Sequence, residues 1–149
     1  MTWKQAKEAK DAAESAKAAV ETTQRKLRAG QLLVLIPQLR WIAQVLEEAI
    51  DMDEPLLTRK HLDNWRWSAS NVRGILSSDD ATERRLLEEL QVSVTLAFTA
   101  NTALADGKGP VRAACKRVRA SISSACDELT AWAGNESQTV DPEGASTGG

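Results

Sequence analysis

The chain has 149 residues and an apolar fraction of 42%, which is enough for one domain with a single modest core. Its 19 basic and 21 acidic residues give a formal net charge of −2, which excludes a strong overall field that would attract nucleic acid or an anionic membrane. Tyrosine is absent, one phenylalanine is present and helix-forming residues dominate, so the composition favours an all-α fold.

The N-terminal segment, residues 1–30, is predicted to be an Ala-rich, coiled-coil-like helix. Each alanine buries little area, and buried apolar area contributes about 25 cal/mol per Å². The apolar stripe of this helix therefore suits close approach of two helices but provides only a weak driving force for their association. The stripe needs a partner, either a second copy or the helices that follow in its own chain. We call it the association seam; it consists of Ala6, Ala9, Ala13, Ala16, Val20, Thr23 and Leu27.

The next segment, residues 31–52, is predicted to be the central helix of a bundle because its polar stripe is narrow. Gly30 either ends the first helix or lies inside one continuous helix, which would cost about 1 kcal/mol. Pro37 either kinks the central helix or begins a helix there. The predicted buried stripe is Leu32, Ile36, Leu39, Ala43, Leu46 and Ile50, widened by Val34, Leu35, Trp41, Ile42 and Val45.

Three further helices are predicted over residues 55–76, 81–105 and 110–134. Asp80 and Glu83 have the spacing of a capping box at the start of the second of these. The polar residues 135–149 are predicted to be a disordered acidic tail. The predicted fold is therefore an all-α antiparallel bundle of four core helices over residues 31–134, preceded by the helix of residues 1–30. Net charge alternates in sign along successive segments, which supports an up-and-down order.

No catalytic or metal-binding constellation is recognisable in the sequence. His61, the only histidine, has no partner at the spacing of a triad or metal site, and we expect it at the surface or at the core boundary. Cys115 and Cys126 are about 16 Å apart along one predicted helix, which is too far for a disulfide with each other. We therefore expect both cysteines to be reduced and to lie in the core. We expect no enzymatic activity, no cofactor and no metal.

Two candidate contact surfaces remain. Trp67 falls on the polar face of its helix beside Arg66 and Asn71, where it either anchors a protein partner or packs within its own chain. A basic helical face of Lys108, Arg112, Lys116 and Arg119 either contacts phosphates or pairs with an acidic neighbouring helix.

The sequence therefore predicts a small cytoplasmic protein that interacts with other proteins as a scaffold, adaptor or regulator. It is expected to bind a protein partner or itself as a homo-oligomer. No segment is expected to span a membrane, because the longest apolar run is far shorter than about 20 residues. The alternative function is accessory nucleic-acid binding through the basic helical face, which would weaken steeply with salt.

Overall fold

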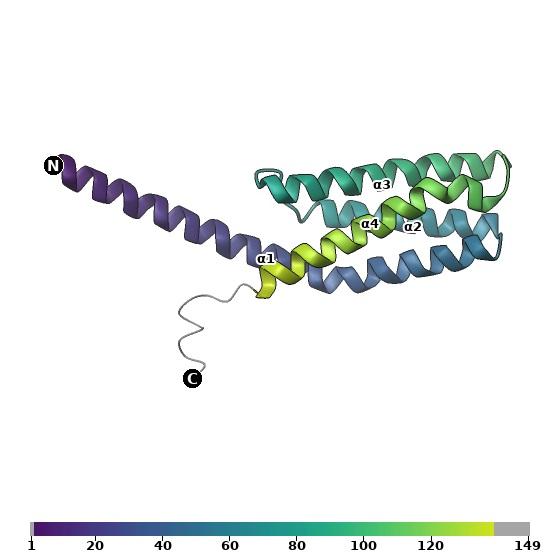
Figure 1. The fold of residues 1–149 in the computed structure, drawn as a ribbon, viewed down its shortest axis with the longest axis horizontal. Helices are drawn as coiled ribbons and strands as arrows, with labels where there is room; N and C mark the ends of the chain where they lie inside the picture. The colour runs from purple at the N-terminus through teal and green to yellow at the C-terminus, as the bar shows by residue number, and fades with distance from the viewer. Residues whose placement is uncertain (1, 139–149) are drawn as a thin grey trace, which may run out of the picture.

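The computed structural model describes residues 2–138, and within them the chain forms an all-α four-helix bundle (Figure 1). Each helix packs against the helix before it, and the last closes the ring against the first. The predicted all-α antiparallel bundle is confirmed. The helices are α1 (Trp3–Asp51), α2 (Pro55–Arg73), α3 (Ala81–Ala105) and α4 (Val111–Gln138).

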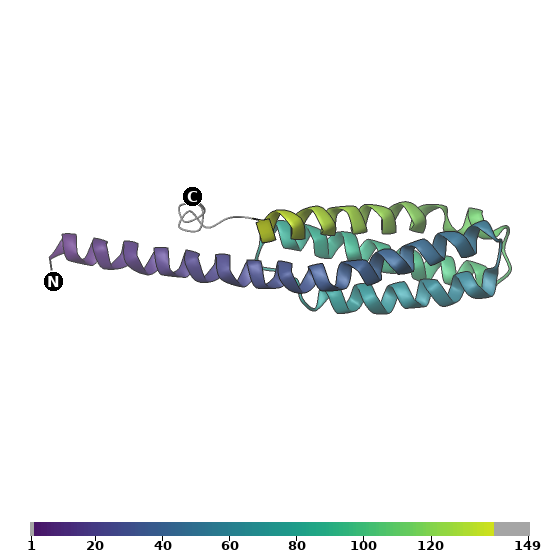
Figure 2. The ribbon, with the colours of Figure 1, turned by 90° about the horizontal axis from the view of Figure 1, so that it is seen from below.

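Helix α1 is continuous for 49 residues and passes through both Gly30 and Pro37. Thr2 caps its start: the Thr2 hydroxyl accepts the Gln5 N–H, and the Gln5 side chain accepts the Thr2 N–H. The two segments predicted on either side of Gly30 are therefore one helix. Its first part projects from the bundle as an arm and its second part is a bundle helix (Figures 1 and 2).

The ribbon shows that α1 changes direction where it enters the bundle (Figures 1 and 2). Pro37 lies within α1, on the solvent side of the helix. A proline removes one helical hydrogen bond and bends the helix away from its ring. The exposed side of α1 is accordingly the outer side of the bend.

The core contains one apolar stripe from each helix, which follows from the 3.6-residue period of their apolar positions. The predicted stripe of α2 is buried as expected, and the two cysteines are free and buried in α4, as expected. His61 is also buried, with 8% of its surface exposed, so its expected surface or boundary position is wrong. The stripe residues of α2 and the loop after it are Leu62, Trp65, Ala69, Val72 and Leu76.

Two polar side chains complete the core between α2 and α3. The indole N–H of Trp65 donates to the Ser93 hydroxyl at 3.0 Å, and that hydroxyl donates to the Leu90 carbonyl at 2.7 Å. This chain satisfies the indole N–H in a site that water does not reach, where an unpaired donor would cost about 1–3 kcal/mol.

Helix α4 extends four residues beyond the predicted end, through Gly134 to Gln138. Trp132 and Ala133 are buried directly before the glycine, and their packing outweighs a helix penalty of about 1 kcal/mol. The predicted disordered tail is thus wrong for residues 135–138. Its remainder, residues 139–149, lies outside the described residues.

By length and composition alone, α1 is the one described helix that qualifies to cross a membrane, with an 18-residue window of mean hydropathy 1.2. This is weak evidence for a span, because α1 also supplies a buried stripe to the bundle core. The absence of a membrane-spanning segment stays a prediction.

Candidate interaction surfaces

The arm is the part of α1 that projects from the bundle, residues 3–24 (Figure 1). Every side chain along it is exposed, and the first half-buried residue of α1 is Arg25. Within residues 2–138 the association seam therefore faces solvent and is not buried against the other helices. An isolated helix of this length is only marginally stable in water, even when it is rich in alanine.

The seam continues past the arm along the solvent side of the bundle part of α1. Val20, Leu27, Val34 and Trp41 follow one another at intervals of seven residues and are 54–78% exposed. The prediction that Val34 and Trp41 widen the buried stripe is wrong, because they lie opposite the core face of the helix. We call the continuous exposed series the outer stripe; it consists of Ala6, Ala9, Ala13, Ala16, Val20, Thr23, Leu27, Gly30, Val34, Pro37 and Trp41.

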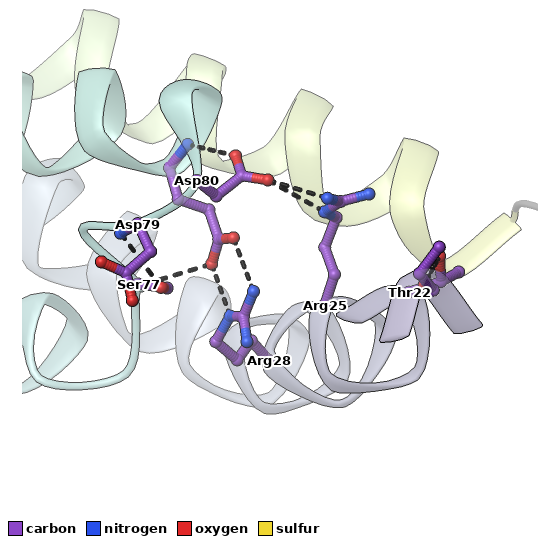
Figure 3. Close-up of polar contacts among 8 residues, drawn as sticks. Thr22, Arg25, Arg28, Ser77, Asp79 and Asp80 are labelled. Carbon is purple, nitrogen blue, oxygen red and sulfur yellow. Dashed lines mark hydrogen bonds and ion pairs between the residues drawn. The ribbon is translucent and has the colours of Figure 1, made fainter. Parts of the chain in front are cut away.

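Two ion pairs, formed by residues of α1 directly after the arm, anchor the base of the arm to the N-terminus of α3 (Figure 3). Arg25 contacts the Asp80 carboxylate at 2.9 Å, and Arg28 donates to both oxygens of Glu83. Asp80 caps α3 by accepting the Glu83 N–H at 3.0 Å. The predicted capping box is therefore half formed, because the Glu83 side chain is directed to Arg28 and to the Ser77 N–H.

The electrostatics of the anchor favour its charged form. Hydrogen bonding to Glu83 raises the pKa of Arg28, while the Glu83 N–H and Arg25 lower the pKa of Asp80 against the effect of its burial. A cavity of about 230 Å³ beside this anchor is lined by residues of α1 and of the loop before α3. Sequence reasoning missed the anchor because its partners are 55 residues apart.

The Trp67 surface lies between α2 and α3. Trp67 is 75% exposed, so packing within the described part of the chain covers little of it. It lines a cavity of about 420 Å³ with Arg66, whose guanidinium stacks on the exposed ring of Phe98 at 5.1 Å. Asn71, predicted to share this surface, lines a different cavity between α1 and α2.

The predicted basic face, of which Lys108 lies in the turn before α4, is divided between solvent and α1. Arg119 forms a double hydrogen bond with Glu47, and Arg112 contacts Asp51 at 3.1 Å. Lys108 and Lys116 are exposed. Two of the four predicted phosphate contacts therefore pair with carboxylates of the neighbouring helix, which was the second interpretation of this row.

Two carboxyl groups meet between α3 and α4. Burial, together with a hydrogen bond to Glu128 and repulsion from it, raises the pKa of Glu89 to about 7. Arg85 contacts Glu128 at 3.4 Å and opposes this shift. Within residues 2–138 no three histidine, cysteine or acidic side chains converge as ligands for a metal ion.

The thiols of α4 are poor nucleophiles in this structure. Burial raises the pKa of Cys115 and of Cys126 to about 11 each. The reactive form of a cysteine is the thiolate, which is scarce at neutral pH under these conditions.

Comparison with known proteins adds no relative: no family model matches the sequence, and no curated protein and no solved structure matches it.

Proposed function

We propose that this chain is a non-catalytic protein-interaction protein in which the four-helix bundle holds out the arm as a docking element for another protein chain. The observation that supports this most directly is the exposed outer stripe on a helix that leaves the bundle. Burying such a stripe against a second helix stabilises both partners, because each apolar side chain leaves water.

The anchor supports the same function. A flexible tether would let the arm fold back or fray, whereas the buried Arg28–Glu83 pair fixes the base of the arm on α3. A docking element that is already ordered loses less conformational entropy on binding. The bundle therefore acts as a rigid base, and the arm as the part that meets a partner.

Site-specific photo-crosslinking tests this proposal. A photoreactive residue replaces Ala16, on the outer stripe, and in a matched control it replaces Ala18, which is exposed on the opposite side of the arm. In cells we expect covalent adducts with a protein from position 16, its own chain included, and few from position 18. Equal or absent labelling at the two positions would contradict the docking function.

A further inference from the structure

The outer stripe has small residues in the first half of the arm and larger ones near its base. Alanines occupy the stripe as far as residue 16, whereas Val20 and Leu27 follow towards the bundle. A parallel second copy would place Leu27 on Leu27 and alanine on alanine, which leaves one end crowded and the other end with gaps. Close packing instead requires large side chains opposite small ones.

An antiparallel second copy meets that requirement. In the heptad register centred near residue 18, Leu27 of one copy lies opposite Ala9 of the other, and Val20 lies opposite Ala16. The same pairs recur on the other side of the two-fold axis. The large side chains of each arm therefore fill the spaces left by the alanines of its partner.

The bend in α1 leaves room for this pairing. The paired stretch from Ala6 to Gly30 is continuous helix, about 36 Å long. The helix changes direction where it enters the bundle (Figure 1). Because Pro37 belongs to the outer stripe and a helix bends away from a proline ring, each bundle turns away from the side on which the partner arm lies. Two bundles consequently sit at opposite ends of the paired arms without collision.

Charge and area set the strength of this contact. Lys17 approaches its own copy near the axis, but Glu14 and Glu21 lie one turn away on either side and offset the repulsion. A strip about 36 Å long and about 10 Å wide covers roughly 400 Å² per copy, half of the standard interface. The association is therefore weak and depends on concentration.

We propose that the arm docks on the arm of a second copy of this chain, antiparallel, with Leu27 against Ala9 and Val20 against Ala16. This inference rests on the proposed function and names its partner. A lipid surface is a poorer occupant, because interfacial helices insert bulky Trp, Phe and Leu side chains, whereas four of the seven residues of the association seam are alanine.

Sedimentation of the purified full chain over a wide concentration range is the first test. We expect a reversible monomer–dimer equilibrium. Ala16→Glu places a charge inside the seam and should raise the dissociation constant by roughly tenfold or more, whereas Ala18→Glu on the opposite side should leave it unchanged. A strict monomer at every concentration would overturn the inference.

Disulfide trapping tests the orientation. Ala9→Cys and Leu27→Cys variants are mixed and oxidised, with the unmodified chain as control because its own thiols are buried. An antiparallel pair gives the mixed 9–27 disulfide, whereas a parallel pair gives 9–9 and 27–27 disulfides and overturns the inference. A monomer that still forms adducts with other proteins from position 16 removes the second copy as partner and leaves the docking function standing.

Discussion

Arg28 and Glu83 form a bidentate ion pair between α1 and α3, with Nε to Oε1 at 2.6 Å and Nη2 to Oε2 at 2.7 Å. The Glu83 side chain is completely buried, while Arg28 reaches it from the edge of the bundle. A buried carboxylate is tolerated only when it is paired and hydrogen-bonded, and Glu83 has Arg28 and the Ser77 N–H for this purpose.

Replacing Arg28 should therefore be costly. Arg28→Met leaves a buried carboxylate without its cation, and we expect the free energy of unfolding to fall by about 3–5 kcal/mol. Arg25→Met, which removes the more exposed pair with Asp80, should cost about 1 kcal/mol or less. Urea unfolding of the two variants measures both values.

The double variant Arg28→Met/Glu83→Leu is the control, because it removes both charges. It should recover much of the stability lost in Arg28→Met, since an apolar pair has no charge left to desolvate. If Arg28→Met were as mild as Arg25→Met, the buried pair would not hold the arm to the bundle.

Trp65 and Trp67 make a matched comparison on one helix. Trp65 fills the core and donates to Ser93, so Trp65→Ala should lower the free energy of unfolding by about 3–5 kcal/mol. Trp67 is exposed, and Trp67→Ala should change the free energy of unfolding by less than about 0.5 kcal/mol. Thermal and urea unfolding measure both. A large loss for Trp67→Ala would mean that the side chain packs within its own chain.

The Glu89–Glu128 pair should make stability depend on pH. The pKa of Glu89 is raised in the folded state to about 7, so the folded chain favours the protonated carboxyl. This stabilisation is complete below the unfolded pKa of about 4.5 and is lost as pH rises through about 7. Between about pH 5 and pH 8 we expect the folded state to weaken relative to a Glu89→Gln variant.

Unfolding titrations of the unmodified chain, Glu89→Gln and Glu88→Gln measure this difference. Glu88 is the exposed neighbour and should leave the pH dependence unchanged. Buried His61, whose pKa is lowered mainly by burial, contributes with the opposite sign in all three proteins and cancels. Parallel curves for all three would show that Glu89 is not protonated in the fold.

The sequence predicted the bundle because apolar periodicity is local and each helix contains it. The stripe of Leu62, Trp65 and Ala69 follows from spacing alone. The outer stripe was only half predicted, because residues 31–52 are apolar nearly all round. Periodicity within one such helix does not show which side faces the core, so Val34 and Trp41 were assigned wrongly.

The continuity of α1 and its anchor could not be predicted for a different reason. A glycine costs a helix about 1 kcal/mol, and burial of Ala29 and Leu32 on either side of Gly30 outweighs that amount. Glu83 has the spacing of a capping residue, but its side chain is recruited by Arg28, which is distant in sequence. Tertiary packing therefore decides both whether α1 continues through Gly30 and which group the Glu83 side chain binds.

Gly30→Ala should stabilise the arm. An added Cβ at Gly30 meets no atom within 4 Å, and the position is helical, so alanine removes backbone freedom from the unfolded chain without a clash. We expect the free energy of unfolding to rise by about 0.5–1 kcal/mol in urea unfolding, with slower amide exchange on both sides of residue 30.

Gly107→Ala is the control variant. The φ of Gly107 is +66°, which is unfavourable for a residue with a Cβ, so this variant should lose stability. A loss of stability in Gly30→Ala as well would mean that α1 works as a joint at this position, and the rigid arm on which the docking proposal depends would have to be abandoned.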